Sequence, residues 1–288
     1  MSLAQLIDAT QLSARLSEPQ LRILDCRFSL DDANYGRRSF AEAHIPGALF
    51  IDLEKDLSGP VTPGRTGRHP LPEPTHLISR LRAARLNNDS EVVLYDDGSG
   101  AFAARAWWLL AWLGKRNDVY LLDGGLKAWR DANGAMTVDT PAMAPGDFTG
   151  MPDDCMVIDA QQLVARLQQL DLTLLDARAL PRFLGKEEPI DPIAGHIPGA
   201  LCVPFTENLD AAGRFLSPDS LRSRFSAKLA GRPEASAVAY CGSGVTACHN
   251  LFAMCLAGLP LARLYPGSWS EWITVPERPV TSHAQLGD

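Results

Sequence analysis

The chain has 288 residues, of which 46% are hydrophobic and 21% are charged, and its formal net charge is -7 at pH 7. This composition is typical of a globular protein and excludes a disordered or fibrous chain. Because the balance is acidic and basic residues form no long run, we expect no nucleic-acid partner and no membrane partner.

The N-terminal residues predict no export signal and no transit peptide, because they lack a basic start followed by an apolar core. The longest apolar stretch, residues 101–113, is broken by Arg105 and is too short to cross a bilayer. The six cysteines include no CxxC pair, so we expect free thiols in a reducing compartment. The sequence therefore predicts a cytoplasmic protein.

The chain contains two copies of one sequence pattern. Residues 6–16 and 157–167 are identical at eight of eleven positions, and the sequence His-Ile-Pro-Gly-Ala occurs at both 44–48 and 196–200. The repeated segments keep their order, and their period is the size of a domain. We infer a tandem duplication rather than a solenoid of short repeats.

The segment between the two copies is rich in proline and glycine, which is typical of a linker. We therefore expect a first domain over residues 1–138, a linker over 139–151, a second domain over 152–280 and a C-terminal tail over 281–288.

Within each copy, the pattern predicts a helix followed by short apolar strands that alternate with further helices. In the first copy, the opening helix is expected at 9–16 and the strands at 22–25, 49–51, 91–95 and 119–122. In the second copy, the helix is expected at 160–167 and the strands at 172–176, 201–203, 237–240 and 262–264. This alternation indicates an α/β fold in which each copy forms a mostly parallel sheet flanked by helices. Ligands of such sheets bind outside the carboxyl ends of the strands.

Residues that both copies share are expected to serve the fold rather than chemistry. They are His44 and His196 before the same turn, Arg27 and Arg178 after the same strand, and Trp129 and Trp272. We expect the histidines to satisfy backbone groups, the arginines to pair with a neighbouring aspartate, and the tryptophans to pack in the two cores.

The loops after the central strands differ between the copies, because Asp96 stands in the first where Cys241 stands in the second. Gly242 and Gly244 allow a tight loop, and a helix is expected to begin near Thr246. The N–H groups of such a loop and the positive end of a helix favour an anion, and so favour the thiolate. We predict that Cys241 is a nucleophile; the alternative is an inert buried thiol.

The duplicated turn and the single loop cysteine resemble the two-domain rhodanese sulfurtransferases over nearly the whole chain. This resemblance implies tandem rhodanese-like domains, of which the first is catalytically silent. Residues 241–246, Cys-Gly-Ser-Gly-Val-Thr, match the pattern of 3-mercaptopyruvate sulfurtransferases, whereas thiosulfate-preferring members carry basic residues just after the cysteine. The resemblance makes Gly242, Gly244, Val245 and Thr246 part of the substrate site.

The carboxylate of 3-mercaptopyruvate calls for a cation outside the loop. Arg182 stands at the Arg-Phe position where the resemblance implies a substrate-binding arginine, and a guanidinium suits a 2-oxo acid. Many members of the family carry a second arginine further along this segment, where this chain has Asp191. Lys186 is one candidate to replace it.

The resemblance also implies a proton relay made of Ser243 in the loop, His69 and Asp56. The chemistry needs one, because pyruvate leaves as an enolate that must gain a proton. The resulting persulfide of Cys241 would pass its sulfur to a thiol acceptor, such as thioredoxin or a small thiol, or to cyanide. We expect neither a metal nor an organic cofactor.

Three other functions remain open on the sequence. A thiosulfate sulfurtransferase is the nearest rival, and a non-enzymatic persulfide carrier is the second, although a carrier needs no substrate clamp. A cysteine phosphatase requires an arginine at the position of Ala247, which makes that class the least favoured.

Overall fold

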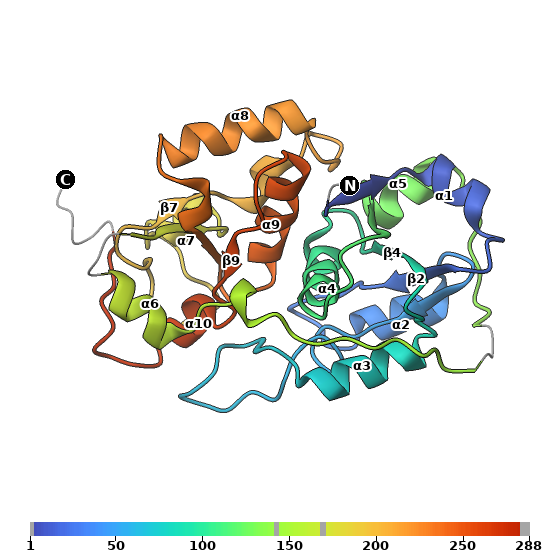
Figure 1. The fold of residues 1–288 in the computed structure, drawn as a ribbon, viewed down its shortest axis with the longest axis horizontal. Helices are drawn as coiled ribbons and strands as arrows, with labels where there is room; N and C mark the ends of the chain where they lie inside the picture. Colours follow the sequence, from blue (N-terminus) through green and yellow to red (C-terminus); the bar gives the residue numbers. More distant parts are fainter. Residues whose placement is uncertain (1–2, 141–143, 168–170, 283–288) are drawn as a thin grey trace. The chain divides into compact units, whose positions relative to one another are not determined.

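The computed structural model describes residues 3–140, 144–167 and 171–282 (Figure 1). Residues 141–143 of the expected linker and 283–288 of the expected tail lie outside the described residues. The chain divides into two compact units, which are described separately. The first comprises Met1–Gly59, Leu71–Asp153 and Leu209–Phe215, and the second comprises Pro60–Pro70, Asp154–Asn208 and Leu216–Asp288.

Each unit therefore takes in a short segment from the other half of the sequence. Pro60–Pro70 belongs to the second unit, where a Cβ atom built on Gly67 would lie only 2.4 Å from the carbonyl oxygen of Gly267. Leu209–Phe215 belongs to the first unit, where the N–H of Phe215 donates to Asp123 at 2.9 Å. The repeat pattern carries no sign of this exchange.

The first unit is built on a five-stranded sheet with the order β1-β5-β4-β2-β3, in which every pair is parallel. Its strands are β1 (Gln5–Ile7), β2 (Leu21–Asp25), β3 (Ala48–Phe50), β4 (Glu91–Tyr95) and β5 (Val119–Leu122). Its helices are α1 (Ala9–Arg15), α2 (Tyr35–Glu42), α3 (Pro74–Ala83), α4 (Ala101–Trp112) and α5 (Gly125–Asp131). In Figure 1, α1 and α5 lie on one side of the strands, and α2 and α3 lie on the other.

The second unit has a four-stranded parallel sheet with the order β7-β6-β8-β9. Its strands are β6 (Thr173–Asp176), β7 (Leu201–Cys202), β8 (Ala237–Tyr240) and β9 (Arg263–Leu264). Its helices are α6 (Ala160–Leu167), α7 (Leu180–Phe183), α8 (Pro218–Leu229), α9 (Thr246–Leu256) and α10 (Ser268–Trp272), with short 3-10 turns η1 (Asp154–Met156), η2 (Phe205–Asn208) and η3 (Glu234–Ser236). Taken from its other end, this order is β9-β8-β6-β7, which matches β5-β4-β2-β3 of the first unit. In the place of β1, next to β9, the structure has a parallel bridge between Val157 and Leu264.

Each sheet buries apolar side chains on both faces, which is why its strands read as continuous apolar runs. On one face of the first sheet, α1 and α5 close a core that includes Trp129, and in the second unit α6 and α10 close a core that includes Trp272. The apolar helices α4 and α9 pack against the central strands β4 and β8. The predicted α/β fold with parallel sheets flanked by helices is confirmed. None of the described helices is long and apolar enough to cross a membrane.

The repeated histidines serve the backbone, as the duplication predicts. Nδ1 of His44 lies 2.7 Å from the carbonyl oxygen of Phe40, and Nδ1 of His196 lies 2.7 Å from that of Phe183. Each imidazole also stacks on the same phenylalanine, with ring centroids 3.8 Å and 3.7 Å apart. The structural role predicted for both histidines is confirmed.

The repeated arginines form buried ion pairs, as predicted. Arg27 bonds Asp25 at 2.6 Å and Arg178 bonds Asp176 at 2.6 Å, and none of the four side chains is more than 2% exposed. Each pair fixes the end of a central strand, because the arginine also donates to a backbone carbonyl that follows in the chain. These pairs belong to the scaffold on which the loops rest.

Candidate functional site

The predicted nucleophile lies at the carboxyl end of a central strand. Cys241 directly follows β8, and the loop 241–245 leads into α9. Cys241 is 2% exposed, and its Sγ accepts a hydrogen bond of 3.1 Å from the N–H of Gly244. Gly244 has a φ of +78°, and a Cβ atom there would lie 2.4 Å from the carbonyl oxygen of Pro266. Only glycine therefore lets the loop fold back over the sulfur.

Helix α10 fixes the start of this loop. The N–H of Cys241 donates to Oγ of Ser268 at 3.1 Å. The carbonyl oxygen of Cys241 accepts a hydrogen bond from Trp269, at 2.9 Å. The carbonyl oxygen of Gly242 accepts one from Ser270, also at 2.9 Å. These three hydrogen bonds fix the backbone beside Cys241 against α10.

Most N–H groups of the loop are left without an acceptor. In the part of the chain that the structure describes, the N–H groups of Gly242, Ser243, Val245 and Thr246 donate to no protein atom. Clustered N–H groups at the positive end of a helix attract an anion. The loop is therefore suited to hold a thiolate or the terminal sulfur of a persulfide.

The matching loop of the first unit holds an anion that belongs to the chain itself. Asp96 directly follows β4 and is 1% exposed. Its Oδ1 accepts hydrogen bonds from the N–H groups of Gly98 and Gly100, at 3.0 Å and 2.9 Å. Its Oδ2 accepts from Phe102 and Ala103, at 2.9 Å and 3.3 Å. The Asp96 carboxylate thus accepts the N–H groups of its own loop, and the first unit has a carboxylate where the second has the Cys241 thiol.

Replacing Asp96 by alanine is expected to destabilise the first unit, because it leaves buried N–H groups without an acceptor. Each such group costs about 1–3 kcal/mol, and since water can enter the vacated space we expect a total loss of about 3 kcal/mol in the free energy of unfolding. Urea unfolding measures it. Asp97→Ala is the matched control, because Asp97 is an exposed neighbour in the same loop. Equal losses in both variants would contradict the role given to Asp96.

His69 lies beside the loop serine. Its Nδ1 is 2.8 Å from Oγ of Ser243, and the two residues are only 4% and 7% exposed. His69 reaches this position within the segment Pro60–Pro70 of the second unit. The N–H of Arg68 anchors that segment by donating to Oγ of Ser270, at 3.1 Å. Two of the predicted relay residues, His69 and Ser243, thus lie within hydrogen-bond distance of each other, and Ser243 is on the loop that carries Cys241.

Asp56, the third residue of the predicted relay, belongs to the first unit. It is 4% exposed, and its Oδ1 accepts a hydrogen bond from Nε of Arg80 at 2.7 Å. Its Oδ2 accepts from the N–H of Asp52 at 2.9 Å. Its part in a proton relay stays a prediction from the resemblance.

Arg182, on the short helix α7, lies close to Gly242, the residue that follows Cys241. A Cβ atom built on Gly242 would lie 3.7 Å from both terminal nitrogens of its guanidinium. Nη2 of Arg182 bonds Glu188 at 2.6 Å and Asp191 at 3.1 Å. These bonds leave its Nη1 without a protein acceptor in the described ranges, on the side of the loop.

A second guanidinium, that of Arg68, lies at the same place. A Cβ atom on Gly242 would lie 2.8 Å from its Nη2. Its Nη1 pairs with Oδ1 of Asp191, the carboxylate that also bonds Arg182. Arg68 was not predicted as a site residue, although its position directly before His69 could have indicated it. Glu188 was not predicted either, and nothing in the sequence around it indicates a place in the site.

The two carboxylates behind these arginines differ in how easily they ionise. Burial opposes ionisation of Glu188, but hydrogen bonds from Arg182 and from the N–H of Asp191 outweigh it and lower the pKa of Glu188. At Asp191, burial prevails over the neighbouring Arg68 and raises the pKa. Among the described residues, no group of three or more His, Cys, Asp or Glu side chains is placed to hold a metal ion. Because Glu188 and Asp191 both bond Arg182 and Asp191 also pairs with Arg68, we assign these carboxylates to the positioning of the arginines.

Lys186, the candidate replacement for the second arginine, is exposed. Its N–H donates to the carbonyl oxygen of Pro181 at 3.0 Å, and its ammonium makes no ion pair with any residue that the structure describes. The side-chain nitrogens nearest to a Cβ atom on Gly242 are those of Arg68 and Arg182. A substrate-binding role of Lys186 stays a prediction.

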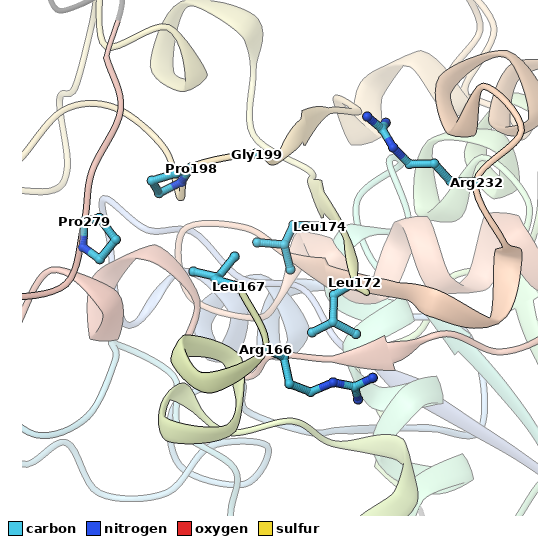
Figure 2. A pocket seen from close by; sticks show the side chains of 8 residues that line it. All are labelled: Arg166, Leu167, Leu172, Leu174, Pro198, Gly199, Arg232 and Pro279. Carbon is cyan, nitrogen blue, oxygen red and sulfur yellow. The ribbon is translucent and has the colours of Figure 1, made fainter. Parts of the chain in front are cut away.

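The second unit also has a cavity that lies away from this loop. Figure 2 shows this cavity, which has a volume of about 530 Å³. It is lined by residues at the amino ends of the strands and on neighbouring segments, namely Arg166, Leu167, Leu172, Leu174, Pro198, Gly199, Arg232 and Pro279. Cys241 follows the carboxyl end of β8, so the cavity is at the opposite end of the strands from Cys241. None of the predicted site residues lines it.

Comparisons with known proteins agree with this geometry. The Rhodanese-like domain family matches residues 8–132 and again residues 159–274. The chain is 65% identical over 282 residues to a probable 3-mercaptopyruvate sulfurtransferase of Pseudomonas aeruginosa, covering 98% of this chain and 99% of that protein. It is 41% identical over 280 residues to a putative thiosulfate sulfurtransferase of Mycobacterium tuberculosis, covering 96% of each.

The fold is also similar to that of a solved structure. The 3-mercaptopyruvate sulfurtransferase from Leishmania major matches with a TM-score of 0.82 and 30% identity, over 94% of this chain and 74% of that one. The resemblance drawn from the duplicated turn and the loop cysteine is confirmed. The family of rhodanese-like domains matches the chain twice, and the relatives align over nearly the full length of the chain. The chain therefore belongs to the rhodanese family, among the sulfurtransferases with two rhodanese-like domains.

Proposed function

We propose that this protein is a 3-mercaptopyruvate sulfurtransferase, which moves sulfur from 3-mercaptopyruvate through a persulfide on Cys241 to a thiol acceptor. One observation carries the proposal: the sulfur of Cys241 lies under a loop whose open N–H groups attract an anion, and Arg182 lies beside that loop. The 65% identity to a probable 3-mercaptopyruvate sulfurtransferase supports the same donor.

In the first step, the Cys241 thiolate attacks the sulfur of 3-mercaptopyruvate. A sulfur–sulfur bond forms, the carbon–sulfur bond breaks, and its electron pair goes to the enolate of pyruvate. The proton of the substrate thiol passes to the enolate carbon, which gives pyruvate. Ser243 and His69, 2.8 Å apart, are suited to carry that proton. Asp56 is proposed as the third member of the relay, from the resemblance alone.

In the second step, an acceptor removes the outer sulfur. Until then the loop N–H groups, from Gly242 to Thr246, stabilise the negative charge on the persulfide. An acceptor thiolate attacks that sulfur, the sulfur–sulfur bond breaks, and Cys241 leaves as the thiolate. We propose thioredoxin or a small thiol as the acceptor, with cyanide as a laboratory substitute. We also propose a cytoplasmic location, since the six cysteines form no disulfide.

A paired donor assay tests the function. Purified protein is mixed with 3-mercaptopyruvate or with thiosulfate, and pyruvate or sulfite is measured together with the intact mass of the protein. We expect pyruvate release and a mass gain of one sulfur atom, which is lost again when a thiol is added. A protein that gains no sulfur from either donor would contradict the enzyme function.

Thiosulfate is the second candidate donor. The relative named a putative thiosulfate sulfurtransferase is 41% identical, and two guanidinium groups lie beside Gly242. The residues after Cys241 carry no charge themselves, which favours 3-mercaptopyruvate. Faster transfer from thiosulfate in the paired assay would reverse this preference.

Replacing Arg182 by alanine is expected to lower kcat/KM for 3-mercaptopyruvate about 100-fold, because hydrogen bonds to charged groups contribute about 1.5–3 kcal/mol each. The variant also leaves Glu188 without its main partner, so Arg182→Lys is needed beside it to keep the charge. Steady-state pyruvate release measures both variants. An unchanged kcat/KM in Arg182→Ala would remove Arg182 from the site.

A further inference from the structure

We propose that an apolar patch beside the site docks a protein acceptor, whose thiol takes the outer sulfur of the Cys241 persulfide. The apolar patch consists of the exposed apolar residues of α7 and of residues 189–193, namely Leu180, Pro181, Pro189, Ile190, Pro192 and Ile193. The inference rests on the proposed function for the persulfide. It names the surface that lets a protein acceptor bind better than a small thiol.

The first support is the exposure of the aliphatic side chains in the apolar patch. Leu180 is 51% exposed, and Ile190 and Ile193 are each 42% exposed. Among the described residues of the second unit, Val61 is the one other large hydrophobic side chain that is exposed. Because burial of apolar surface is favourable, exposed apolar side chains gathered in one place mark an interaction surface.

The second support is that contacts hold the two parts of the apolar patch together. The carbonyl oxygen of Pro181 accepts a hydrogen bond from the N–H of Lys186 at 3.0 Å, so the chain turns back after α7. Nη2 of Arg182 then bonds Glu188 at 2.6 Å and Asp191 at 3.1 Å, which fixes the returning segment against α7. The two parts are thus held in place before a partner binds, which lowers the entropic cost of docking.

The third support is that the apolar patch borders the loop of the nucleophile. Asp191 is the one buried residue within residues 189–193, and its carboxylate bonds Arg182. The terminal nitrogens of Arg182 lie 3.7 Å from the position of a Cβ atom on Gly242. The backbone that exposes the apolar side chains on one side therefore reaches the site on the other.

Trp269 ties the far end of the apolar patch to the nucleophile. Its Nε1 donates to the carbonyl oxygen of Ile193 at 2.8 Å, and its N–H donates to the carbonyl oxygen of Cys241 at 2.9 Å. One tryptophan thus spans the distance between the two backbones. Cys241 is 2% exposed, so an acceptor must be held against the surface while its thiol enters.

The fourth support comes from the duplication. Residues 37–41, Arg-Arg-Ser-Phe-Ala, stand at the same distance before the first His-Ile-Pro-Gly-Ala turn as residues 189–193, Pro-Ile-Asp-Pro-Ile, before the second. Residues 37–41 belong to helix α2, on which Arg37 and Arg38 are exposed. The first unit therefore has a polar surface at the place where the unit with the nucleophile has the apolar patch.

The apolar patch fits a protein that carries its thiol on an apolar face, because a small thiol has no surface to bury against it. With a dithiol protein, the first thiolate attacks the outer sulfur of the persulfide, the sulfur–sulfur bond breaks, and Cys241 leaves as the thiolate. The second thiol then forms a disulfide with the first and releases hydrogen sulfide. The dithiol is oxidised and the transferred sulfur is reduced, so the step needs no other reductant.

The test compares a double variant, Ile190→Ser with Ile193→Ser, with Leu30→Ser. Leu30 is 58% exposed in the first unit, so it controls for the loss of an exposed apolar side chain. The protein is loaded from 3-mercaptopyruvate, and hydrogen sulfide release is measured with reduced thioredoxin or with dithiothreitol. We expect the double variant to raise KM for thioredoxin about 10-fold and to keep its rate with dithiothreitol. Leu30→Ser should match the unmodified protein with both acceptors.

A conservative double variant and the oligomeric state complete the test. Ile190→Val with Ile193→Val should keep KM for thioredoxin near that of the unmodified protein, because valine preserves an apolar surface. Equal losses with thioredoxin and dithiothreitol in the serine variant, or an unchanged KM for thioredoxin, would overturn the proposal. A dimer that the serine variant converts to a monomer in size-exclusion chromatography would assign the apolar patch to a second copy of the chain, which also overturns it.

The outcomes also separate this inference from the proposed function. If the unmodified protein gains no sulfur from 3-mercaptopyruvate, the proposed function fails, and loading Cys241 with sodium polysulfide still allows the comparison of the two acceptors. If sulfur passes from 3-mercaptopyruvate to dithiothreitol and the serine variant leaves KM for thioredoxin unchanged, the function stands and the docking role of the apolar patch fails.

Discussion

Cys241→Ser is expected to lower sulfur transfer from either donor by about 10⁴-fold or more, which is the scale seen when a covalent nucleophile is removed. A serine hydroxyl is not ionised near neutral pH and forms no persulfide, so the open N–H groups of the loop have no thiolate to stabilise. The fold should persist, because serine can still accept the hydrogen bond of Gly244. Pyruvate release and the intact mass after exposure to 3-mercaptopyruvate measure the effect.

Two other cysteines supply the controls for this experiment. Cys155 is exposed on η1, and Cys155→Ser should keep full activity and still gain one sulfur atom. Cys248 is buried on α9, where its Sγ donates to the carbonyl oxygen of Gly244 at 3.3 Å. Cys248→Ser should also transfer sulfur, with a modest change at most. Persulfide formation in Cys241→Ser, or its loss in Cys155→Ser, would contradict the assignment of the nucleophile.

The central strands were predictable from the sequence because their apolar runs are short and sharply bounded. The expected ranges 91–95, 119–122 and 237–240 coincide with β4, β5 and β8. Strands in the middle of a parallel sheet are covered on both faces, so their residues are apolar for the same reason, apart from Glu91 at the start of β4. The sequence of such a strand therefore shows directly that the strand is buried.

The edge strand β1 and the polar helices α2 and α7 were not predictable from apolar runs. β1 (Gln5–Ile7) is three residues long at the edge of the sheet and runs straight into the pattern of α1. Helices α2 and α7 have no expected range in the sequence, because neither has a broad apolar face to mark it. Short edge strands and polar helices depend on tertiary contacts that no local pattern records.

The duplication made the loop predictable without any other protein for comparison. Asp96 and Cys241 occupy matching positions after matching strands, so the difference between them predicts a change of role. The structure gives the physical reason, since the Asp96 carboxylate accepts four backbone hydrogen bonds from its own loop. Arg68 escaped the same comparison, because it lies in a segment that joins the second unit from the first half of the chain.

His69→Gln is expected to slow sulfur transfer from 3-mercaptopyruvate by about 10²- to 10⁴-fold, the range in which general acid–base groups contribute. Nδ1 of His69 lies 2.8 Å from Oγ of Ser243, and both residues are nearly buried, so bulk water has little access to deliver the proton. Ser243→Ala should lose a similar factor. The double variant should lose little more than either single variant, because the two residues pass one proton.

The choice of donor separates this relay from a structural role of His69. When thiosulfate gives up its outer sulfur, sulfite leaves without taking a proton on carbon, so His69→Gln should affect that transfer far less. His76→Gln is the matched control, because His76 is an exposed histidine on α3 in the first unit. Equal losses with both donors in His69→Gln would mean that His69 only shapes the loop around Ser243. A loss confined to 3-mercaptopyruvate identifies the step that needs His69 as protonation of the departing enolate.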